Sequence, residues 1–380
     1  MKKLDLRIPG PVPLPEQVLR ANAQPMINHR GKDFTARLPV ILNRLRPLFG
    51  TKENILLPLT GSGTAAMEAA VVNVVSPGDS VLVLVGGSFG DRWLQMCHRF
   101  GAKIYAIHYP WGEAADPNLV SEYLKQHPEI KAIFVTHNES STAVLNDIQA
   151  LAEARSDSDA LIIVDAVSSL GGTPVEMDAW GLDVVVTASQ KCLMAPPGLS
   201  FICLSSRARE VVSKTESLKY YFDLSLYEQM LESGETPFTP NLSAFFALEE
   251  SLKLIEEEGL EQIFKRHILL RDMARAGIRA LDIPLLVKDE WASPTTTSVA
   301  PLGVDVDKIR LMIRDELGVE LAGGQGQLAG KIFRIGHMGY VTPLDILTCL
   351  AAIEIAFKKP GQAVAAAEKT WRFKDESGIV

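Results

Sequence analysis

Short apolar runs that alternate with helix-like stretches are the feature that most limits how this chain can fold. Several runs are almost continuously apolar, which is typical of strands covered on both faces. Stretches with helical spacing, such as Ala65–Val75 and Asp91–Phe100, separate most of them. Repeated strand–helix–strand units predict a mostly parallel sheet with helices on both faces. The runs are Val81–Val85, Lys103–Ile107, Ala132–Val135, Leu161–Val164, Val184–Val186 and Leu199–Cys203.

After Pro240 the pattern changes to longer helices and fewer strands. A strongly amphipathic helix is predicted over Ser243–Glu258, and Gly259 ends it before a second helix that runs to about Leu281. The remaining segments alternate between strand-like and helix-like and predict a smaller α+β unit. These segments are Thr295–Ala300, Asp305–Leu317, Ile332–Ile335 and Pro343–Phe357.

The chain is therefore predicted to be an α/β protein with two domains and an N-terminal arm. Residues 1–20 are rich in proline, which resists helix and sheet alike, so we expect an extended arm. The large domain, with its mostly parallel mixed sheet, is predicted over residues 21–264. The small α+β domain is predicted over residues 265–380, and the final Ala/Lys-rich stretch indicates no particular structure.

Composition and charge exclude several classes of protein. The 380 residues include 38 Lys and Arg against 46 Asp and Glu, a net charge of −8 that disfavours a nucleic-acid binder. The four cysteines lie far apart with no C-x-x-C pair, so we expect no metal site, no disulfide scaffold and a cytoplasmic location. No apolar stretch approaches the roughly 20 residues of a membrane span. The charged N-terminus also differs from a secretory signal, and we predict no membrane partner.

A glycine- and hydroxyl-rich turn precedes one of the predicted helices. The segment Thr60–Thr64 (TGSGT) runs directly into the helix-forming stretch Ala65–Ala70. Backbone N–H groups at a helix N-terminus, together with the Ser62 and Thr64 hydroxyls, can bind a phosphate. The same pattern also fits an ordinary N-cap in a tight turn, and alone it favours that interpretation. It matches neither a Walker loop nor G-x-G-x-x-G.

Two charged residues follow buried strands. Asp165 ends the apolar run Leu161–Val164, and Lys191 follows Val184–Val186 just before a Pro-Pro-Gly turn. The carboxyl ends of parallel strands face the ligand crevice, where a carboxylate can hold a protonated ring nitrogen. A desolvated lysine there is a candidate amine nucleophile. Taken singly, the aspartate also fits a cap and the lysine also fits a surface loop.

The three features together are far more specific than any one of them. Pyridoxal 5′-phosphate (PLP) needs a phosphate cradle, an acid that keeps its pyridine nitrogen protonated, and a lysine that forms a Schiff base. Thr60–Thr64, Asp165 and Lys191 supply these groups in one predicted sheet. The sequence therefore predicts PLP as the cofactor.

The chain resembles the class V, fold-type I PLP-dependent aminotransferases, and within them the alanine–glyoxylate and serine–pyruvate aminotransferase group. The resemblance spans most of the chain in the expected order. The segments that carry it are Ile8–Pro11 (IPGP), Thr136–Thr142 (THNESST), Val164–Pro174 (VDAVSSLGGTP), Ala188–Gly198 (ASQKCLMAPPG) and Phe333–Gly339 (FRIGHMG).

The resemblance implies roles for individual residues. Lys191 would be the Schiff-base lysine and Asp165 the partner of the pyridine nitrogen, and these two are the expected catalytic residues. Arg334 would grip the substrate α-carboxylate, for which a planar guanidinium is suited, and Gly10 would lie at the substrate. The remaining implied cofactor contacts are Ser62, Gly63, Thr64 and Gln190 at the phosphate, Ser140 near the 3′-oxygen, Phe89 and Val167 at the ring, and Thr239.

Thr239 matches a residue that reaches the phosphate of the neighbouring subunit, so a homodimer with shared active sites is implied. Two positions depart from a member of the family. Phe89 stands where that member has a tryptophan over the ring, and phenylalanine can still stack with less area. Thr236 stands where it has a tyrosine that contacts phosphate across the interface, so this one contact is in doubt.

The expected activity is transfer of an amino group from alanine or serine to glyoxylate or pyruvate. No second arginine is assigned to a side-chain carboxylate, which disfavours aspartate and glutamate, although Arg30 or Arg92 remain candidates. A class V lyase or cysteine desulfurase is the first alternative, but the glycine-rich loop Ala322–Leu328 has no cysteine. An aminotransferase-like subunit of a larger assembly is the second.

Overall fold

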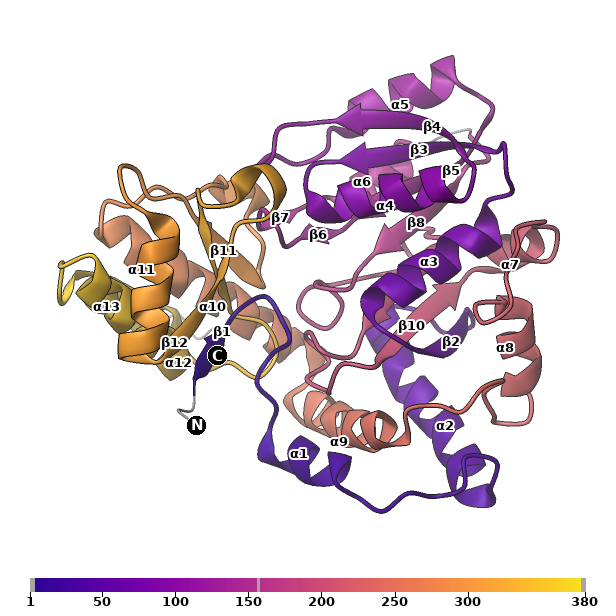
Figure 1. Cartoon of the computed structure of the whole chain (residues 1–380), viewed down its shortest axis with the longest axis horizontal. Helices are drawn as coiled ribbons and strands as arrows, with labels where there is room; N and C mark the ends of the chain where they lie inside the picture. Colours follow the sequence, from indigo (N-terminus) through magenta and orange to yellow (C-terminus); the bar gives the residue numbers. More distant parts are fainter. Residues whose placement is uncertain (1–3, 156–157, 377–380) are drawn as a thin grey trace.

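The structure is a computed structural model that describes residues 4–155 and 158–376 (Figure 1). The strands of its largest sheet are β2 (Ile55–Thr60), β3 (Ser80–Val85), β4 (Lys103–His108), β5 (Ile130–Thr136), β8 (Leu161–Asp165), β9 (Val184–Ala188) and β10 (Leu199–Leu204). Their order is β2-β10-β9-β8-β5-β3-β4. β4, β3, β5, β8 and β9 are parallel, whereas β10 runs antiparallel to both of its neighbours. This confirms the predicted α/β class with a mostly parallel, mixed sheet.

Both faces of this sheet are buried, as the continuous apolar runs predict. Along β3, Leu82 and Leu84 pack into one core cluster, while Val81, Val83 and Val85 pack into another on the opposite face. Alternate side chains of a strand point to opposite faces, so a strand covered on both sides needs apolar residues throughout.

Helices cover the two faces of the sheet. Figure 1 shows α3 and α4 in front of it, where they pack against β9 and β3 respectively. α9 begins at the cap Asn241, whose side chain accepts the N–H of Ala244, and it ends at Gly259 as predicted. The helices of this part are α2 (Lys32–Leu45), α3 (Gly63–Val74), α4 (Ser88–Arg99), α5 (Pro117–Gln126), α6 (Ile148–Glu153), α7 (Ser206–Val212), α8 (Leu224–Leu231) and α9 (Leu242–Glu258). A short hairpin of β6 (Asn138–Glu139) and β7 (Val144–Leu145) follows β5.

A second, four-stranded sheet has its own core beside the first. Its order is β1-β12-β13-β11. In Figure 1 this sheet lies to the left of the large one, with β11 and β12 in orange and β1, from the start of the chain, in indigo. The predicted boundary at residues 264 and 265 falls inside α10, which contacts both α9 and α13, and the domain limits stay a prediction. The elements are β1 (Asp5–Arg7), β11 (Thr296–Val299), β12 (Val319–Gly323), β13 (Phe333–Gly336), α10 (Leu260–Ala280), α11 (Val306–Met312), α12 (Pro343–Ala356) and α13 (Gln362–Glu376).

The expectation that residues 1–20 form neither helix nor sheet is wrong in two places. β1 pairs in parallel with β12, with Asp5 opposite Val319. α1 (Glu16–Asn22) begins directly after Pro15 and packs against α9. Asp5–Arg7 precedes the prolines and can therefore complete a sheet edge, and a proline at a helix start removes no intrahelical hydrogen bond.

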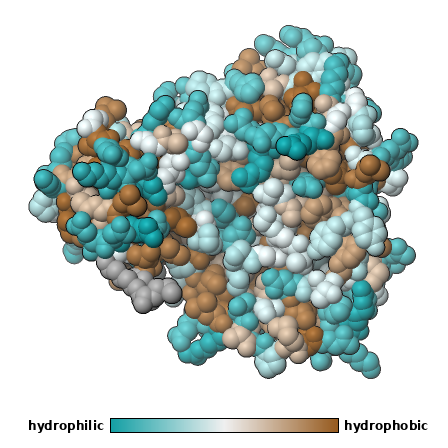
Figure 2. Space-filling model, viewed as in Figure 1, coloured by the Kyte–Doolittle hydropathy of each residue, from teal (hydrophilic) through white to brown (hydrophobic). Residues whose placement is uncertain are grey.

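The surface seen in Figure 2 mixes hydrophilic and hydrophobic residues, and several hydrophobic ones lie between the second sheet and the region of α1. A cleft there is lined by residues that include Leu6, Leu14, Leu19 and Tyr340. Among the described residues, no helix has the length and apolar character needed to cross a bilayer.

Candidate active site

The N-terminus of α3 is built to receive an anion. Its N-cap residue, Ser62, is exposed, and its side chain makes no capping hydrogen bond, unlike Asp147 at the start of α6. The first N–H groups of the helix are therefore not occupied by an ordinary side-chain cap. Gly63 lies against Val167, and a Cβ on Gly63 would lie 2.8 Å from Val167 Cγ2. The predicted phosphate turn and the predicted ring contact are thus adjacent.

Asp165 ends β8 at the carboxyl edge of the sheet, close to this turn. It is buried, and its Oδ1 accepts the N–H of Val167 at 2.8 Å. Burial raises the pKa of its carboxyl to about 6, while the nearby charges of Arg92 and Lys191 lower it. No donor among the described residues binds its second oxygen. The carboxylate can therefore accept a hydrogen bond from a ligand cation.

Lys191 lies in the turn that follows β9, facing the N-terminal arm. Its Nζ donates to the carbonyl oxygen of Pro9. Gly10 lies so close that a Cβ there would come within 2.6 Å of Lys191 Cδ, and its φ of +92° also favours glycine. Burial, aided by the positive charges of Arg334 and Arg92 and opposed by the negative charge of Asp165, lowers the pKa of the Lys191 amine to about 8. About a tenth of the amine is therefore neutral and nucleophilic at pH 7, far more than for an ordinary lysine.

Gln190, next to the lysine, carries a buried side-chain oxygen with no hydrogen-bond partner among the described residues. Buried polar atoms are normally paired, so such an atom indicates a missing polar ligand. Because the oxygen and nitrogen of an amide exchange places by a simple flip, the group can also donate to an anion.

Arg334, on β13, is buried without a carboxylate partner. Its Nε and Nη2 donate to the carbonyl oxygen of Gly323 at 3.0 and 2.8 Å, and its Nη1 donates to that of Ser140 at 2.7 Å. Burial lowers its pKa to about 10. None of the described carboxylates forms an ion pair with it, so a buried cation near Lys191 is available to a carboxylate ligand.

Phe89 and Thr64 are joined by a residue that the sequence analysis did not place at the cofactor. Arg92 Nη1 donates to Thr64 Oγ1 at 2.9 Å, and its guanidinium lies 4.7 Å from the centre of the Phe89 ring. Glu139, a buried carboxylate inside the THNESST segment that carried the resemblance, is a second site residue that was not predicted from the sequence. That segment was the available signal, but its local pattern does not reveal what the glutamate contacts.

The other predicted positions are more peripheral. Thr239 is exposed on the loop before α9, and among the described residues no hydrogen bond joins it to the rest of the site. Thr236 is buried, and its hydroxyl donates to the carbonyl oxygen of Phe238. His137 lies behind Asp165, and burial lowers its pKa to about 3, which keeps the ring neutral. No cluster of metal-ligating side chains occurs in residues 4–155 and 158–376.

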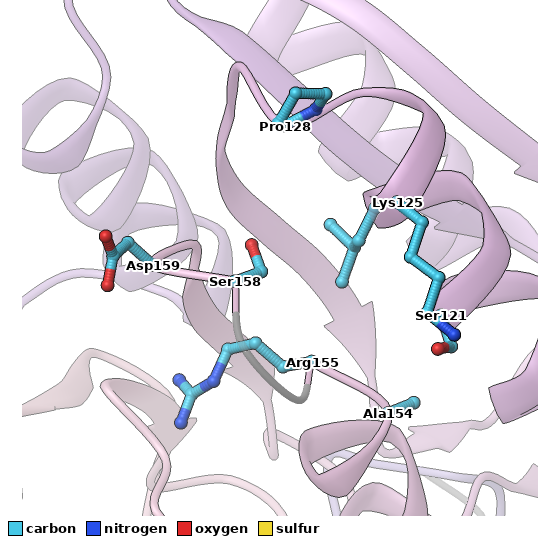
Figure 3. Close-up of a pocket in the computed structure, with 8 residues that line it drawn as sticks. Ser121, Lys125, Pro128, Ala154, Arg155, Ser158 and Asp159 are labelled. Carbon is cyan, nitrogen blue, oxygen red and sulfur yellow. The ribbon is translucent and has the colours of Figure 1, made fainter.

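A separate pocket lies elsewhere, between α5 and the segment after α6. Figure 3 shows Lys125, Arg155 and Asp159 around it. Arg155 already donates to Asp183 at 2.7 Å. None of the predicted site residues lines this pocket, so we assign it no part in the chemistry.

The arrangement around Lys191 fits PLP. The uncapped helix start suits a phosphate, and glycine at position 63 leaves room beside Val167. The buried side-chain oxygen of Gln190 has no hydrogen-bond partner among the described residues, as expected where a polar ligand binds. Asp165 and Lys191 provide the acid and the amine. These features define the class of the protein as an enzyme that uses PLP.

Comparison with known proteins identifies the family. The sequence profile described as Aminotransferase class-V matches residues 16–346. A protein named soluble hydrogenase 42 kDa subunit, from Anabaena cylindrica, is 43% identical over 94% of each chain. Serine–glyoxylate aminotransferase of Arabidopsis thaliana is 36% identical over 94% of this chain and 91% of its own. The solved structure of alanine–glyoxylate aminotransferase from Nostoc sp. has a TM-score of 0.90 at 33% identity, covering 94% of this chain and 96% of its own.

This chain belongs to the class V aminotransferases, which confirms the resemblance. It has the fold-type I architecture, it uses PLP, and it is a transaminase.

Proposed function

We propose that this enzyme transfers the amino group of alanine or serine to glyoxylate or pyruvate. The observation that carries the proposal is Arg334, the one buried arginine without a carboxylate partner among the residues that the structure describes. Its charge is close enough to lower the pKa of Lys191. An α-carboxylate at Arg334 would bring the α-carbon of the substrate toward the lysine amine.

The other arginines considered for a side-chain carboxylate are already engaged. Arg30 pairs with Glu235 on the surface. Arg92 has no described carboxylate partner, but its guanidinium is held between Thr64 Oγ1 and the Phe89 ring. Arg310, whose charge also lowers the pKa of Arg334, pairs with Asp307 at 2.8 Å. A donor with one carboxylate therefore suits this site better than aspartate or glutamate.

The residues act as follows in this proposal. Bound PLP withdraws electrons from the α-carbon and so makes the α-proton acidic. The neutral amine of Lys191 would accept that proton at Nζ and would then return it as a general acid. Asp165 would bind the protonated ring nitrogen, Arg334 would hold the α-carboxylate, and Phe89 and Val167 would pack against the ring.

The test is half-reaction spectroscopy with a panel of amino acids and no acceptor. Alanine and serine should convert the absorption of the bound cofactor to that of pyridoxamine phosphate fastest. A higher kcat/KM for aspartate than for alanine or serine would contradict the proposed donor class.

A homodimer that shares its active sites also belongs to the proposal, because Thr239 is exposed and matches the family position that crosses the interface. Thr239→Val should weaken PLP binding without changing the monomer fold, and light scattering should give twice the chain mass. We also propose a cytoplasmic location, since all four cysteines are buried and free.

Two alternatives have separate tests. Relatives named as soluble hydrogenase subunits, 43% and 42% identical, favour a second candidate function as a subunit of a larger assembly. A purified protein that stays colourless with added PLP would support that candidate against the transaminase.

Desulfurase activity is disfavoured because Cys192, beside the lysine, is buried and burial raises its pKa to about 12. Sulfide release from cysteine would reverse that conclusion.

A further inference from the structure

Glu139 is a fully satisfied buried carboxylate that the proposed mechanism does not use. Its side chain is 2% exposed. Oε2 accepts the backbone N–H groups of Phe89 and Gly90 at 3.0 and 3.1 Å. Oε1 accepts the N–H of Ser141 at 3.2 Å and also its hydroxyl. A buried carboxylate with four donors and no described ion-pair partner is held for its hydrogen bonds.

The first pair of donors belongs to the start of α4. An acidic group there satisfies free N–H groups and interacts favourably with the helix dipole. A Cβ at the preceding residue, Gly87, would lie 2.3 Å from Glu139 Cδ, so a larger residue there would displace the carboxylate. The same first turns of α4 carry Phe89 and Arg92, so Glu139 fixes where both side chains stand.

The second pair of donors connects to the carboxylate-binding arginine. Ser141 follows Ser140, whose carbonyl oxygen accepts from Arg334 Nη1 at 2.7 Å. The Ser141 hydroxyl also accepts the N–H of Ser88 at 3.0 Å. The negative charge of Glu139 raises the pKa of Arg334, so the two groups also interact through space. One carboxylate therefore joins the ring-covering helix to the segment that holds the arginine.

We propose that Glu139 is a positioning residue. It sets the distance between the Phe89 ring, which packs on the cofactor, and the Arg334 guanidinium, which binds the substrate carboxylate. This inference rests on the proposed function only for the roles of those two residues. Loss of the link would let α4 and the Ser140 segment move independently. Cofactor affinity and donor affinity would then both fall.

The test compares Glu139→Gln with a matched control. The amide keeps the shape but replaces one acceptor oxygen by a donor that faces other donors. Glu354 is the control, because it is also buried and accepts two backbone N–H groups, from Gly361 and Val364, at 3.0 and 2.9 Å. It lies in the small sheet's core, so Glu354→Gln should reduce thermal stability and leave binding unchanged.

The readouts are the PLP dissociation constant of the cofactor-free protein, KM and kcat for the amino donor, and thermal stability. In Glu139→Gln the dissociation constant and KM should each rise on the order of tenfold. Ser141→Ala removes one donor to Glu139 and the acceptor of the Ser88 N–H but leaves the carboxylate in place, so it should raise KM by less. It remains informative if the glutamine variant does not fold. A Glu139→Gln protein that loses only stability, as the control does, would overturn the proposal. Failure of the wild type to use alanine or serine would refute the donor assignment alone, since the PLP titration is independent of it.

Discussion

Asp165→Asn is the sharpest test of how this site is built, because two measurements should move in opposite directions. Asp165 is 3% exposed, and burial raises the pKa of its carboxyl from 3.8 to about 6. A change of that size corresponds to about 3 kcal/mol. In the cofactor-free protein, the ionised carboxylate therefore destabilises the fold by roughly this amount relative to its protonated form.

Asparagine keeps an oxygen that can accept the N–H of Val167 and removes the charge. Because the folded pKa lies above the unfolded value, the protonated Asp165 stabilises the wild type relative to its ionised form. This contribution falls as pH rises from 3.8 to about 6 and is absent at higher pH. The cofactor-free variant should then be more stable than the wild type above pH 6, by up to about 3 kcal/mol. The difference should shrink as pH falls toward 3.8.

The same variant should bind PLP more weakly and turn over more slowly, because an amide cannot keep the ring nitrogen protonated. Denaturation of the cofactor-free protein on both sides of pH 6 and a PLP titration measure the two effects. Asp183→Asn is the matched control, since Asp183 pairs with Arg155 at 2.7 Å and Arg207 at 2.9 Å and its loss should destabilise. If Asp165→Asn destabilised the cofactor-free protein above pH 6 as the control does, our account of the site's electrostatics would be wrong.

Three further outcomes are expected. Lys191→Ala should abolish transamination and the visible absorption of the bound cofactor; a variant that retains turnover would remove the central assignment. Arg334→Lys should raise KM for the amino donor by about 10- to 100-fold, because lysine cannot make the two-pronged contact, and an unchanged KM would contradict the carboxylate role. The rate at which cofactor-free protein recaptures PLP should rise with pH to a midpoint near 8, where the Lys191 amine loses its proton. A midpoint near the ordinary lysine value of 10.5 would show that burial does not tune this amine.

The large sheet could be predicted from the sequence because its strands are buried on both faces and leave a continuous apolar signal. All six predicted runs are strands, with ends displaced by a few residues. β2 escaped prediction because Pro58 interrupts its pattern, and the structure tolerates the proline because β2 lies at the sheet edge. β1 escaped because its partner, β12, lies far away in the sequence. α13 escaped because its alanine-rich sequence gains its order from packing against α10.

Site residues could likewise be predicted where their neighbours in the sequence indicate their role, and not where the role depends on contacts with distant segments. Asp165 and Lys191 stand at strand ends, and their position relative to an apolar run is visible in the sequence. Arg92 and Glu139 have no comparable signal. Their roles depend on contacts with Thr64 and with the first turn of α4, which the fold brings close from 28 and 50 residues away in the sequence. A residue whose function is to link two segments cannot be recognised from either segment alone.

The charges of the site explain why ligands should stabilise this enzyme strongly. Burial shifts the pKa of Asp165 upward and those of Lys191 and Arg334 downward, each against its charged form. The fold therefore holds three ionisable groups whose charges are incompletely compensated by the chain itself. A protonated pyridine ring and an α-carboxylate supply the missing opposite charges for Asp165 and Arg334. Ligand binding should therefore raise the unfolding temperature by more than an equally large ligand would in a site without charged groups. High salt should reduce this rise only slightly, because the charged groups are buried.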